Sequence, residues 1–197
     1  MYRTHIVQEG ETMRKLSVFN HISLDAYFVD KNGQMSWAKA HQDPEWNSFV
    51  ADNAKGGGEL MFGRVTYEMM AGFWPTPMAK EMMPEVAERM NSGPKIVFSR
   101  TLDSPAWNNT RLIKGDLVSE VRKLKEESGD DMVIMGSGTI IAQLAPAKLI
   151  DSYQFVVNPI VLGGGRTMFQ DLPNQLNLTL KESRRFGNGN VVLTYAA

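Results

Sequence analysis

The sequence predicts an α/β fold of three layers, in which helices cover both faces of a mostly parallel mixed sheet with an antiparallel edge at the C-terminus. Two observations predict the parallel part. A strand runs through a glycine into a helix at Gly63, and the same pattern recurs at Gly136. A third observation predicts the antiparallel edge, because the strand-rich last third of the chain contains the hairpin-turn signal Gly-Asn-Gly-Asn at residues 187–190.

The N-terminal part supplies a strand, a turn and a capped helix. Residues 16–22 predict a strand from their β-branched and aromatic content, and residues 30–33 predict a turn. Asp43 has the properties of a helix N-cap, and Pro44 suits the first turn of a helix that ends near residue 53. Apolar residues fall at i, i+3 and i+4 on one face of this helix: Trp46, Phe49 and Val50.

The middle of the chain contains the first strand-glycine-helix unit and a second pair of elements. Residues 59–62 predict a short buried strand, and Gly63 leads from it into a helix over residues 64–70. Residues 84–90 predict a further short helix, and residues 95–99 predict the next strand.

The last part of the chain contains the clearest helix and the second strand-glycine-helix unit. Asp116 caps a helix that Gly129 stops, with Leu117, Val118, Val121 and Leu124 on one face. Residues 132–135 form the continuous apolar run expected of a central strand, and a glycine turn then leads into a helix through Leu144. Further strands are predicted within residues 149–157, 177–186 and 191–195.

Length and composition limit the classes of protein. The 197 residues suit one domain, which we assign to residues 13–197, and we interpret residues 1–12 as a loose N-terminal extension. The net charge of −1 offers no general attraction for nucleic acid or anionic lipid, and no stretch approaches the ~20 apolar residues of a membrane span. The absence of cysteine and of an export signal favours the reducing cytoplasm. The three histidines are isolated, so no metal site is predicted.

Two glycine turns carry the candidate phosphate chemistry. Gly63, Arg64 and Thr66 offer free backbone N–H groups, a guanidinium and a hydroxyl at a helix start. The segment Gly136-Ser137-Gly138-Thr139 offers the same groups without the cation, and we expect a pyrophosphate to approach its glycines so closely that a side chain at Gly138 would block binding without preventing folding. Ile141 replaces the last glycine of the Rossmann fingerprint, so a standard Rossmann domain is disfavoured. The alternative is that both glycines only form tight turns.

The order of these motifs resembles a known family. Residues 61–68, 94–100 and 133–138, with Leu144-Ala-Pro146, are similar to the successive cofactor-binding segments of dihydrofolate reductases. Residues 23–25 and 158–166 are closer to the reductase domain of riboflavin biosynthesis, the RibD C-terminal domain, and its stand-alone relatives. The resemblance covers roughly residues 14–195. It implies a dihydrofolate-reductase-like fold with NADPH across the sheet, its phosphates on the two turns, and a homodimer.

The same resemblance assigns the other end of the cofactor and suggests acids for proton donation. It implies that Arg64, Ser99 and Arg100 hold the adenosine end and its 2′-phosphate. The acid that dihydrofolate reductases carry on their first helix is split here between Asp43, three residues before Trp46, and Glu45, four residues before Phe49. Asp43 also suits an N-cap, so we prefer Glu45, with Asp25 as the other candidate catalytic carboxylate.

The substrate is expected to lie among aromatic and polar side chains near these acids. The residues predicted to contact it are Asn20, Ser23, Phe28, Trp46, Phe49 and Trp74. His21, inside a strand, is interpreted as a core or pocket-edge histidine and not as a base. The sequence therefore predicts an NADPH-dependent reductase of a small heterocyclic or carbonyl substrate. The alternatives are an authentic dihydrofolate reductase and a non-catalytic nucleotide-binding module on the same fold.

Overall fold

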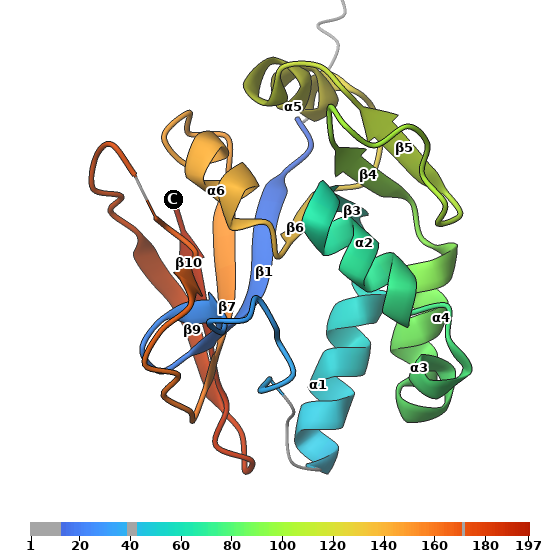
Figure 1. The fold of residues 1–197 in the computed structure, drawn as a ribbon. Coiled ribbons are helices and arrows are strands. Elements are labelled where there is room, and N and C mark those ends of the chain that lie inside the picture. The colour runs from blue at the N-terminus through green and yellow to red at the C-terminus, as the bar shows by residue number, and fades with distance from the viewer. Residues whose placement is uncertain (1–12, 39–42, 171) are drawn as a thin grey trace, which may run out of the picture.

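Eight strands form one sheet in the order β5-β4-β3-β6-β1-β7-β10-β9 in the computed structural model, which describes residues 13–38, 43–170 and 172–197 (Figure 1). The strands of this sheet are β1 (Leu16–Ser23), β3 (Glu59–Gly63), β4 (Lys95–Phe98), β5 (Thr110–Ile113), β6 (Met132–Met135), β7 (Ser152–Asn158), β9 (Thr179–Arg185) and β10 (Val191–Ala196). Two short strands, β2 (Tyr27–Val29) and β8 (Arg166–Thr167), form a separate antiparallel pair.

Strand directions confirm the predicted mostly parallel sheet with an antiparallel C-terminal edge. All neighbours from β5 to β7 are parallel, whereas β10 is antiparallel to both β7 and β9. The strand β6 lies between β3 and β1, as its continuous apolar run predicts. Its side chains alternate between faces, with Met132 and Ile134 in one core and Val133 and Met135 against another.

Helices cover both faces of the sheet. The helices α5 (Leu117–Glu126) and α6 (Gly138–Leu144) share the largest apolar core with the inner strands, which includes Val121, Leu124 and Ile141. The opposite face packs against α1 (Pro44–Lys55), α2 (Arg64–Phe73), α3 (Pro77–Met82) and α4 (Pro84–Ser92) through two smaller cores. Among the described residues, no helix is long and apolar enough to span a membrane.

Capping chemistry sets the helix starts that the sequence predicts. Asp43 Oδ1 accepts from the N–H groups of Glu45 and Trp46, at 2.9 and 3.3 Å, which confirms Asp43 as the N-cap of α1. Asp116 caps α5 by accepting from the N–H of Ser119 at 3.0 Å. Asp43 also accepts from Asn188 N–H at 3.0 Å, so the start of α1 lies beside the last hairpin, whereas α5 starts after the carboxyl end of β5.

Four elements are additional to those that the sequence predicts. Helix α3 has no apolar periodicity and depends on Thr76, whose hydroxyl accepts from Ala79 N–H at 3.2 Å. The strands β2, β5 and β8 contain two to four residues each, too few for a period-2 pattern to be recognised. The predicted loose extension over residues 1–12 lies outside the described residues.

Candidate functional site

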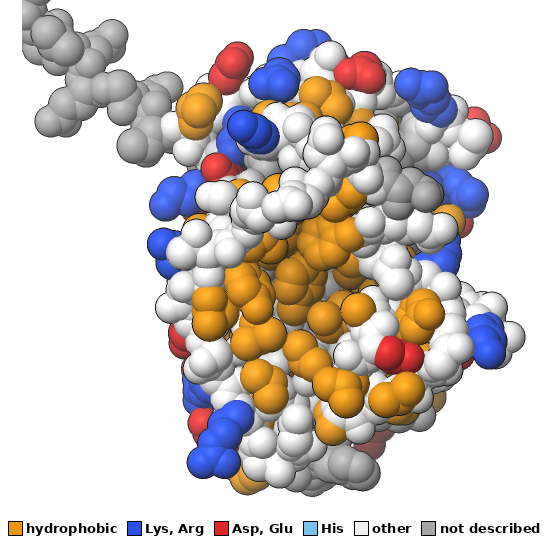
Figure 2. All heavy atoms as spheres, turned by 90° about the vertical axis from the view of Figure 1, so that its left-hand side faces the viewer, with side chains coloured by type: hydrophobic (Ala, Val, Ile, Leu, Met, Phe, Trp, Pro, Cys, Tyr) orange, Lys and Arg blue, Asp and Glu red, His pale blue; other side chains and the backbone are white. Residues whose placement is uncertain are grey.

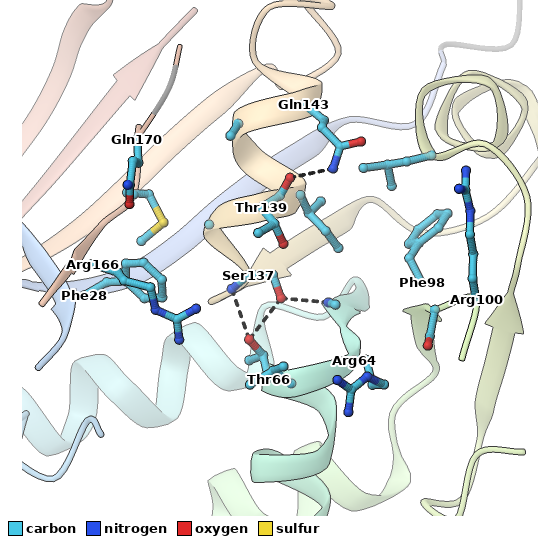
Figure 3. Close-up of a pocket in the computed structure, with 18 of the residues that line it drawn as sticks. Phe28, Arg64, Thr66, Phe98, Arg100, Ser137, Thr139, Gln143, Arg166 and Gln170 are labelled. Atoms are coloured by element: carbon cyan, nitrogen blue, oxygen red, sulfur yellow. Dashed lines mark hydrogen bonds between the residues drawn. The ribbon is translucent and has the colours of Figure 1, made fainter. Parts of the chain in front are cut away.

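A cavity of about 850 Å³ opens at the carboxyl ends of β3, β4, β5 and β6, where α2, α5 and α6 begin (Figure 3). Of the predicted cofactor residues, those that line it are Gly63, Arg64, Thr66, Ser99, Arg100, Ser137, Gly138 and Thr139. Gly136 is buried immediately behind this lining. The structure thus brings both glycine turns and the predicted adenosine-end residues into one space of a volume that suits a dinucleotide.

Hydrogen bonds tie the two glycine turns together. Ser137 Oγ accepts from the backbone N–H of Gly63 at 2.7 Å and donates to Thr66 Oγ1 at 3.0 Å. Thr66 Oγ1 also accepts from Ser137 N–H at 3.1 Å. Because Thr66 accepts twice here, its hydroxyl proton is free to be donated to another acceptor, and no described residue takes it. The first N–H groups of α6, at Gly138 and Thr139, have no hydrogen-bond partner among the described residues.

The second turn is held in a left-handed conformation. Gly136 and Ser137 have φ of +63° and +58°, which is uncommon for serine. Asn20 stabilises this turn, because its Oδ1 accepts from Gly136 N–H at 2.7 Å and its Nδ2 donates to Gly136 O at 3.4 Å. Asn20 is buried, so it supports the turn from behind and is not exposed to a substrate as predicted.

Packing within the protein also constrains the two glycine positions, apart from any phosphate that approaches them. A Cβ on Gly136 would approach Thr66 Cγ2 to 2.7 Å, so the left-handed turn itself needs glycine. A Cβ on Gly138 would lie 3.1 Å from the ring of Phe28. A side chain at Gly138 would therefore also press on Phe28, and that it blocks cofactor binding while folding survives stays a prediction.

The residues that the resemblance assigns to the adenosine end form one wall of the cavity (Figure 3). Arg64, the first residue of α2, forms an exposed ion pair with Glu68 at 2.9 Å. Arg100 is exposed and lies near Asp116, whose pKa is lowered by the N–H and hydroxyl of Ser119 and, more weakly, by Arg100. Ser99 closes the turn after β4, because its Oγ accepts from Leu102 N–H at 2.9 Å.

The opposite wall comes from the small β2–β8 sheet. Phe28 on β2 and Arg166 on β8 face the cavity, and Met168 and Gln170 follow in the same wall (Figure 3). The guanidinium of Arg166 lies 5.8 Å from the ring centroid of Phe28 and forms no ion pair within the described part of the chain. Phe28 is a predicted substrate contact, whereas Arg166 ends the segment 163–166, whose sequence suits equally a phosphate loop or a turn between the late strands.

The two predicted catalytic acids are not brought into this cavity. Asp25 accepts hydrogen bonds from Ser23 and from the backbone of a distant loop, and the Ser23 hydroxyl chiefly lowers its pKa to about 2. A carboxyl group that is ionised at all physiological pH values has no proton to donate. Glu45 lies exposed in the first turn of α1, paired with Arg184 at 2.8 Å, and its catalytic role stays a prediction.

The other predicted substrate contacts lie in packed cores. Ser23 is fully buried, donates to Asp25 and accepts from Tyr27 N–H at 3.0 Å. Trp46 and Phe49 pack with Phe186 in the small core under α1, and Trp74 belongs to the core beside α2 and α4. None of these four side chains lines the described cavity.

His21 lies among packed aromatic side chains and does not line the described cavity, which fits a core histidine more than one at a pocket edge. Its ring packs edge-on against Phe19 and Trp46, and Asn158 Nδ2 lies 3.4 Å from its Nδ1. Burial lowers the pKa of His21 to about 4, so the ring is neutral at pH 7. The described residues contain no group of three or more side chains that could hold a metal ion.

The fold and the position of its cavity define a protein of the dihydrofolate-reductase-like class. The chain belongs to the RibD C-terminal domain family, whose model matches residues 14–192. A curated relative, the uncharacterized protein YyaP of Bacillus subtilis (strain 168), is 26% identical over 174 residues, which cover 88% of this chain and 90% of the relative.

Solved structures share the fold. A protein described provisionally as a riboflavin biosynthesis protein from Shewanella sp. PV-4 matches with a TM-score of 0.74 at 25% identity, over 92% of this chain and 98% of that one. A Thermotoga maritima diaminohydroxyphosphoribosylaminopyrimidine deaminase/5-amino-6-(5-phosphoribosylamino)uracil reductase gives 0.66 at 13% identity, over 93% and 56%. Dihydrofolate reductase from Enterococcus faecalis, complexed with NADP(H), gives 0.57 at 15% identity, over 92% and 95%. The last two comparisons concern the fold alone, which is one associated with reductases.

Proposed function

We propose that this protein is an NADPH-dependent reductase that transfers a hydride to a small heterocyclic or carbonyl substrate, in the manner of the riboflavin-biosynthesis reductases. One observation carries the proposal. Two linked turns and a pair of arginines face a single cavity at the carboxyl edge of a parallel sheet, and the N–H groups of Gly138 and Thr139 in the second turn have no partner among the described residues. A dinucleotide with three phosphate groups needs such a combination of backbone donors and cations.

The residues that would hold the cofactor follow from the donors available. The pyrophosphate would accept from the N–H groups of Gly138 and Thr139 and from the hydroxyl of Thr66. The 2′-phosphate, which distinguishes NADPH from NADH, would lie between the guanidinium groups of Arg64 and Arg100. The solved dihydrofolate reductase of the same fold was obtained with NADP(H), which supports this cofactor.

The wall formed by β2 and β8 would then face the end of the cofactor that transfers the hydride. When bound, NADPH supplies the hydride, so the residues of this chain have to orient the two reactants and keep water away. The ring of Phe28 and the side chain of Met168 offer an apolar surface for this purpose. Arg166 offers guanidinium N–H donors to a carbonyl oxygen or an anionic group of the substrate. The Thermotoga reductase, by its name, acts on a phosphoribosylated uracil, a substrate that carries both kinds of group.

The test is a substrate screen that follows NADPH absorbance, together with cofactor affinities of three variants. Arg100→Ala should weaken NADPH by about 1.5–3 kcal/mol and leave NADH unchanged, because one charge-assisted phosphate contact is lost. Arg64→Ala should weaken NADPH binding by less than Arg100→Ala does, because Glu68 already neutralises part of the Arg64 charge. Glu68→Gln is the matched control: it should tighten NADPH by less than about 1 kcal/mol. Equal affinity of the wild-type protein for both nucleotides would contradict the assignment.

The proposal includes assembly as a homodimer. Hydrophobic side chains gather in a hollow on the side of the molecule that carries β9 and β10 (Figure 2). On β10 the half-buried Leu193 and Tyr195 pair with Phe155 and Tyr153 of β7. A two-fold interface would cover this apolar surface. Light scattering should give about twice the 22.1 kDa of one chain, and Leu193→Glu should halve that mass; a wild-type mass of one chain would count against the dimer.

A further inference from the structure

The carboxylate of Asp25 connects two loops that are distant in the sequence. Its Oδ1 accepts from the Ser23 hydroxyl at 2.6 Å and from Leu162 N–H at 3.1 Å. Its Oδ2 accepts from Gly163 N–H at 2.8 Å. Both oxygens are therefore occupied by donors, and two of the three donors belong to the loop that follows β7.

The backbone around Asp25 is shaped to make this connection. Leu24 N–H donates to Ile160 O at 2.8 Å, which adds a further bond between the same two loops. Ala26 has a φ of +65°, a left-handed conformation that alanine rarely adopts. Its N–H donates to Ser23 O at 2.9 Å, which closes the turn. A strained non-glycine residue persists only where its surroundings hold it, and the bonds of Ser23 and Asp25 do so here.

Each connected loop leads directly into one strand of the cavity wall. Residue 27 begins β2 immediately after the turn, and residue 166 begins β8 three residues after Gly163. The two strands pair at Tyr27 with Thr167 and at Val29 with Arg166. These strands place Phe28 and Arg166 at the cavity (Figure 3). A sheet of only two short strands is marginally stable alone, so it needs an external tie.

We infer that Asp25 is a positioning residue, whose carboxylate clamps the loop 160–163 to the turn 23–26 and thereby holds Phe28 and Arg166 as one wall of the cavity. The effect on cofactor binding rests on the proposed function, whereas the clamp itself does not. An ionised carboxylate is needed in this role because it accepts from all its partners at once, and an amide cannot. Asp25 is accordingly assigned a role other than the proton donation expected from the sequence.

The experiment compares Asp25→Asn with the wild-type protein and with Asp103→Asn, a control at an exposed aspartate whose side chain forms no hydrogen bond or ion pair within the described part of the chain. Amide hydrogen exchange of the ligand-free proteins is measured first. In Asp25→Asn, one amide N–H of Leu162 or Gly163 would face the new side-chain NH₂ group. Exchange should then rise at least about tenfold over residues 160–170 and in β2, while the central strands β1 and β6 keep their protection.

NADPH affinity is measured next, between pH 5 and pH 8. The dissociation constant of Asp25→Asn should rise about tenfold at every pH, because a carboxylate that is already ionised contributes no titration in this range. Should Asp25→Asn fail to fold, Ser23→Ala, which removes one donor to the same carboxylate, should show the same pattern of exchange with smaller amplitude.

Three results would overturn the inference. Unchanged exchange at residues 162 and 163 would show that there is no clamp. Increased exchange throughout the sheet would show that Asp25 contributes only to global stability. Local loosening with unchanged NADPH affinity would show that the clamp does not position the cavity wall. Failure of the wild-type protein to bind NADPH would refute the proposed function instead, and the exchange of the ligand-free proteins would still decide whether the clamp exists.

Discussion

Replacement of Ser137 by alanine tests whether the link between the two glycine turns builds the cavity. The hydroxyl of Ser137 accepts from Gly63 N–H at 2.7 Å and donates to Thr66 at 3.0 Å. Its side chain is 7% exposed, so water does not readily replace it. Alanine removes both bonds and keeps a left-handed backbone with φ of +58° at a non-glycine residue.

The expected loss of stability follows from these contacts. The unpaired N–H of Gly63 should cost about 1–3 kcal/mol, and the lost bond to Thr66 about 1 kcal/mol. Ser137→Ala should therefore lower the free energy of unfolding by about 2–4 kcal/mol. Ser137→Gly loses the same bonds. Compared with alanine, glycine relieves about 1–2 kcal/mol of strain in the left-handed backbone, but it loses about 0.5–1 kcal/mol more conformational entropy on folding. The glycine variant should be the more stable of the two by about 0.5–1 kcal/mol.

The assay is urea unfolding of the wild-type protein and the variants at one protein concentration. Thr139→Ala is the matched control, because Thr139 is exposed in the same turn and its hydroxyl has no bond among the described residues. This control should stay within about 0.5 kcal/mol of the wild-type protein. If Ser137→Ala were as stable as Thr139→Ala, or Ser137→Gly less stable than Ser137→Ala, the reasoning about the linked turns would be refuted.

Three other predictions concern packing and pH. Gly138→Val should lower NADPH affinity, and it should lower the stability of the ligand-free protein by about 1–3 kcal/mol because the new side chain meets Phe28. An unchanged melting temperature of the ligand-free variant would contradict this packing. Lys95→Met should lower the free energy of unfolding in urea by about 2–4 kcal/mol, because the buried Nζ donates to three carbonyls at the end of α4, those of Met90, Asn91 and Gly93. An unchanged free energy of unfolding would show that these bonds do not stabilise the fold. Burial lowers the pKa of His21 to about 4, whereas in the unfolded chain this histidine takes up a proton as the pH falls through about 6.5. The free energy of unfolding should therefore drop by on the order of 2 kcal/mol by pH 4.5. Unfolding at pH 7 and 4.5 would measure this drop, which His21→Gln should reduce.

Local chemistry explains what the sequence could predict. The caps at Asp43 and Asp116 and the apolar run of β6 depend on residues a few positions apart, so their patterns are visible in the sequence. The rule that parallel strands present their carboxyl ends at one edge then suffices to bring Gly63 and Ser137 together.

Contacts between distant segments explain what the sequence missed. Asp25 suggested an acid for proton transfer, but its partners Leu162 and Gly163 lie 137 and 138 positions away. Asn20 is tied to Gly136 at a separation of 116 residues, which no local pattern records. Arg166 reaches the cavity only because β8 pairs with β2, and a strand of two residues has no periodicity.

The most direct test of the account is calorimetric titration of the wild-type protein with NADPH and, in parallel, with NADH. We expect saturable binding of one NADPH per chain and at least about tenfold weaker binding of NADH, because only NADPH carries the phosphate that suits Arg64 and Arg100. The absence of binding by either nucleotide, or equal affinity for both, would contradict the assignment of the cavity to NADPH.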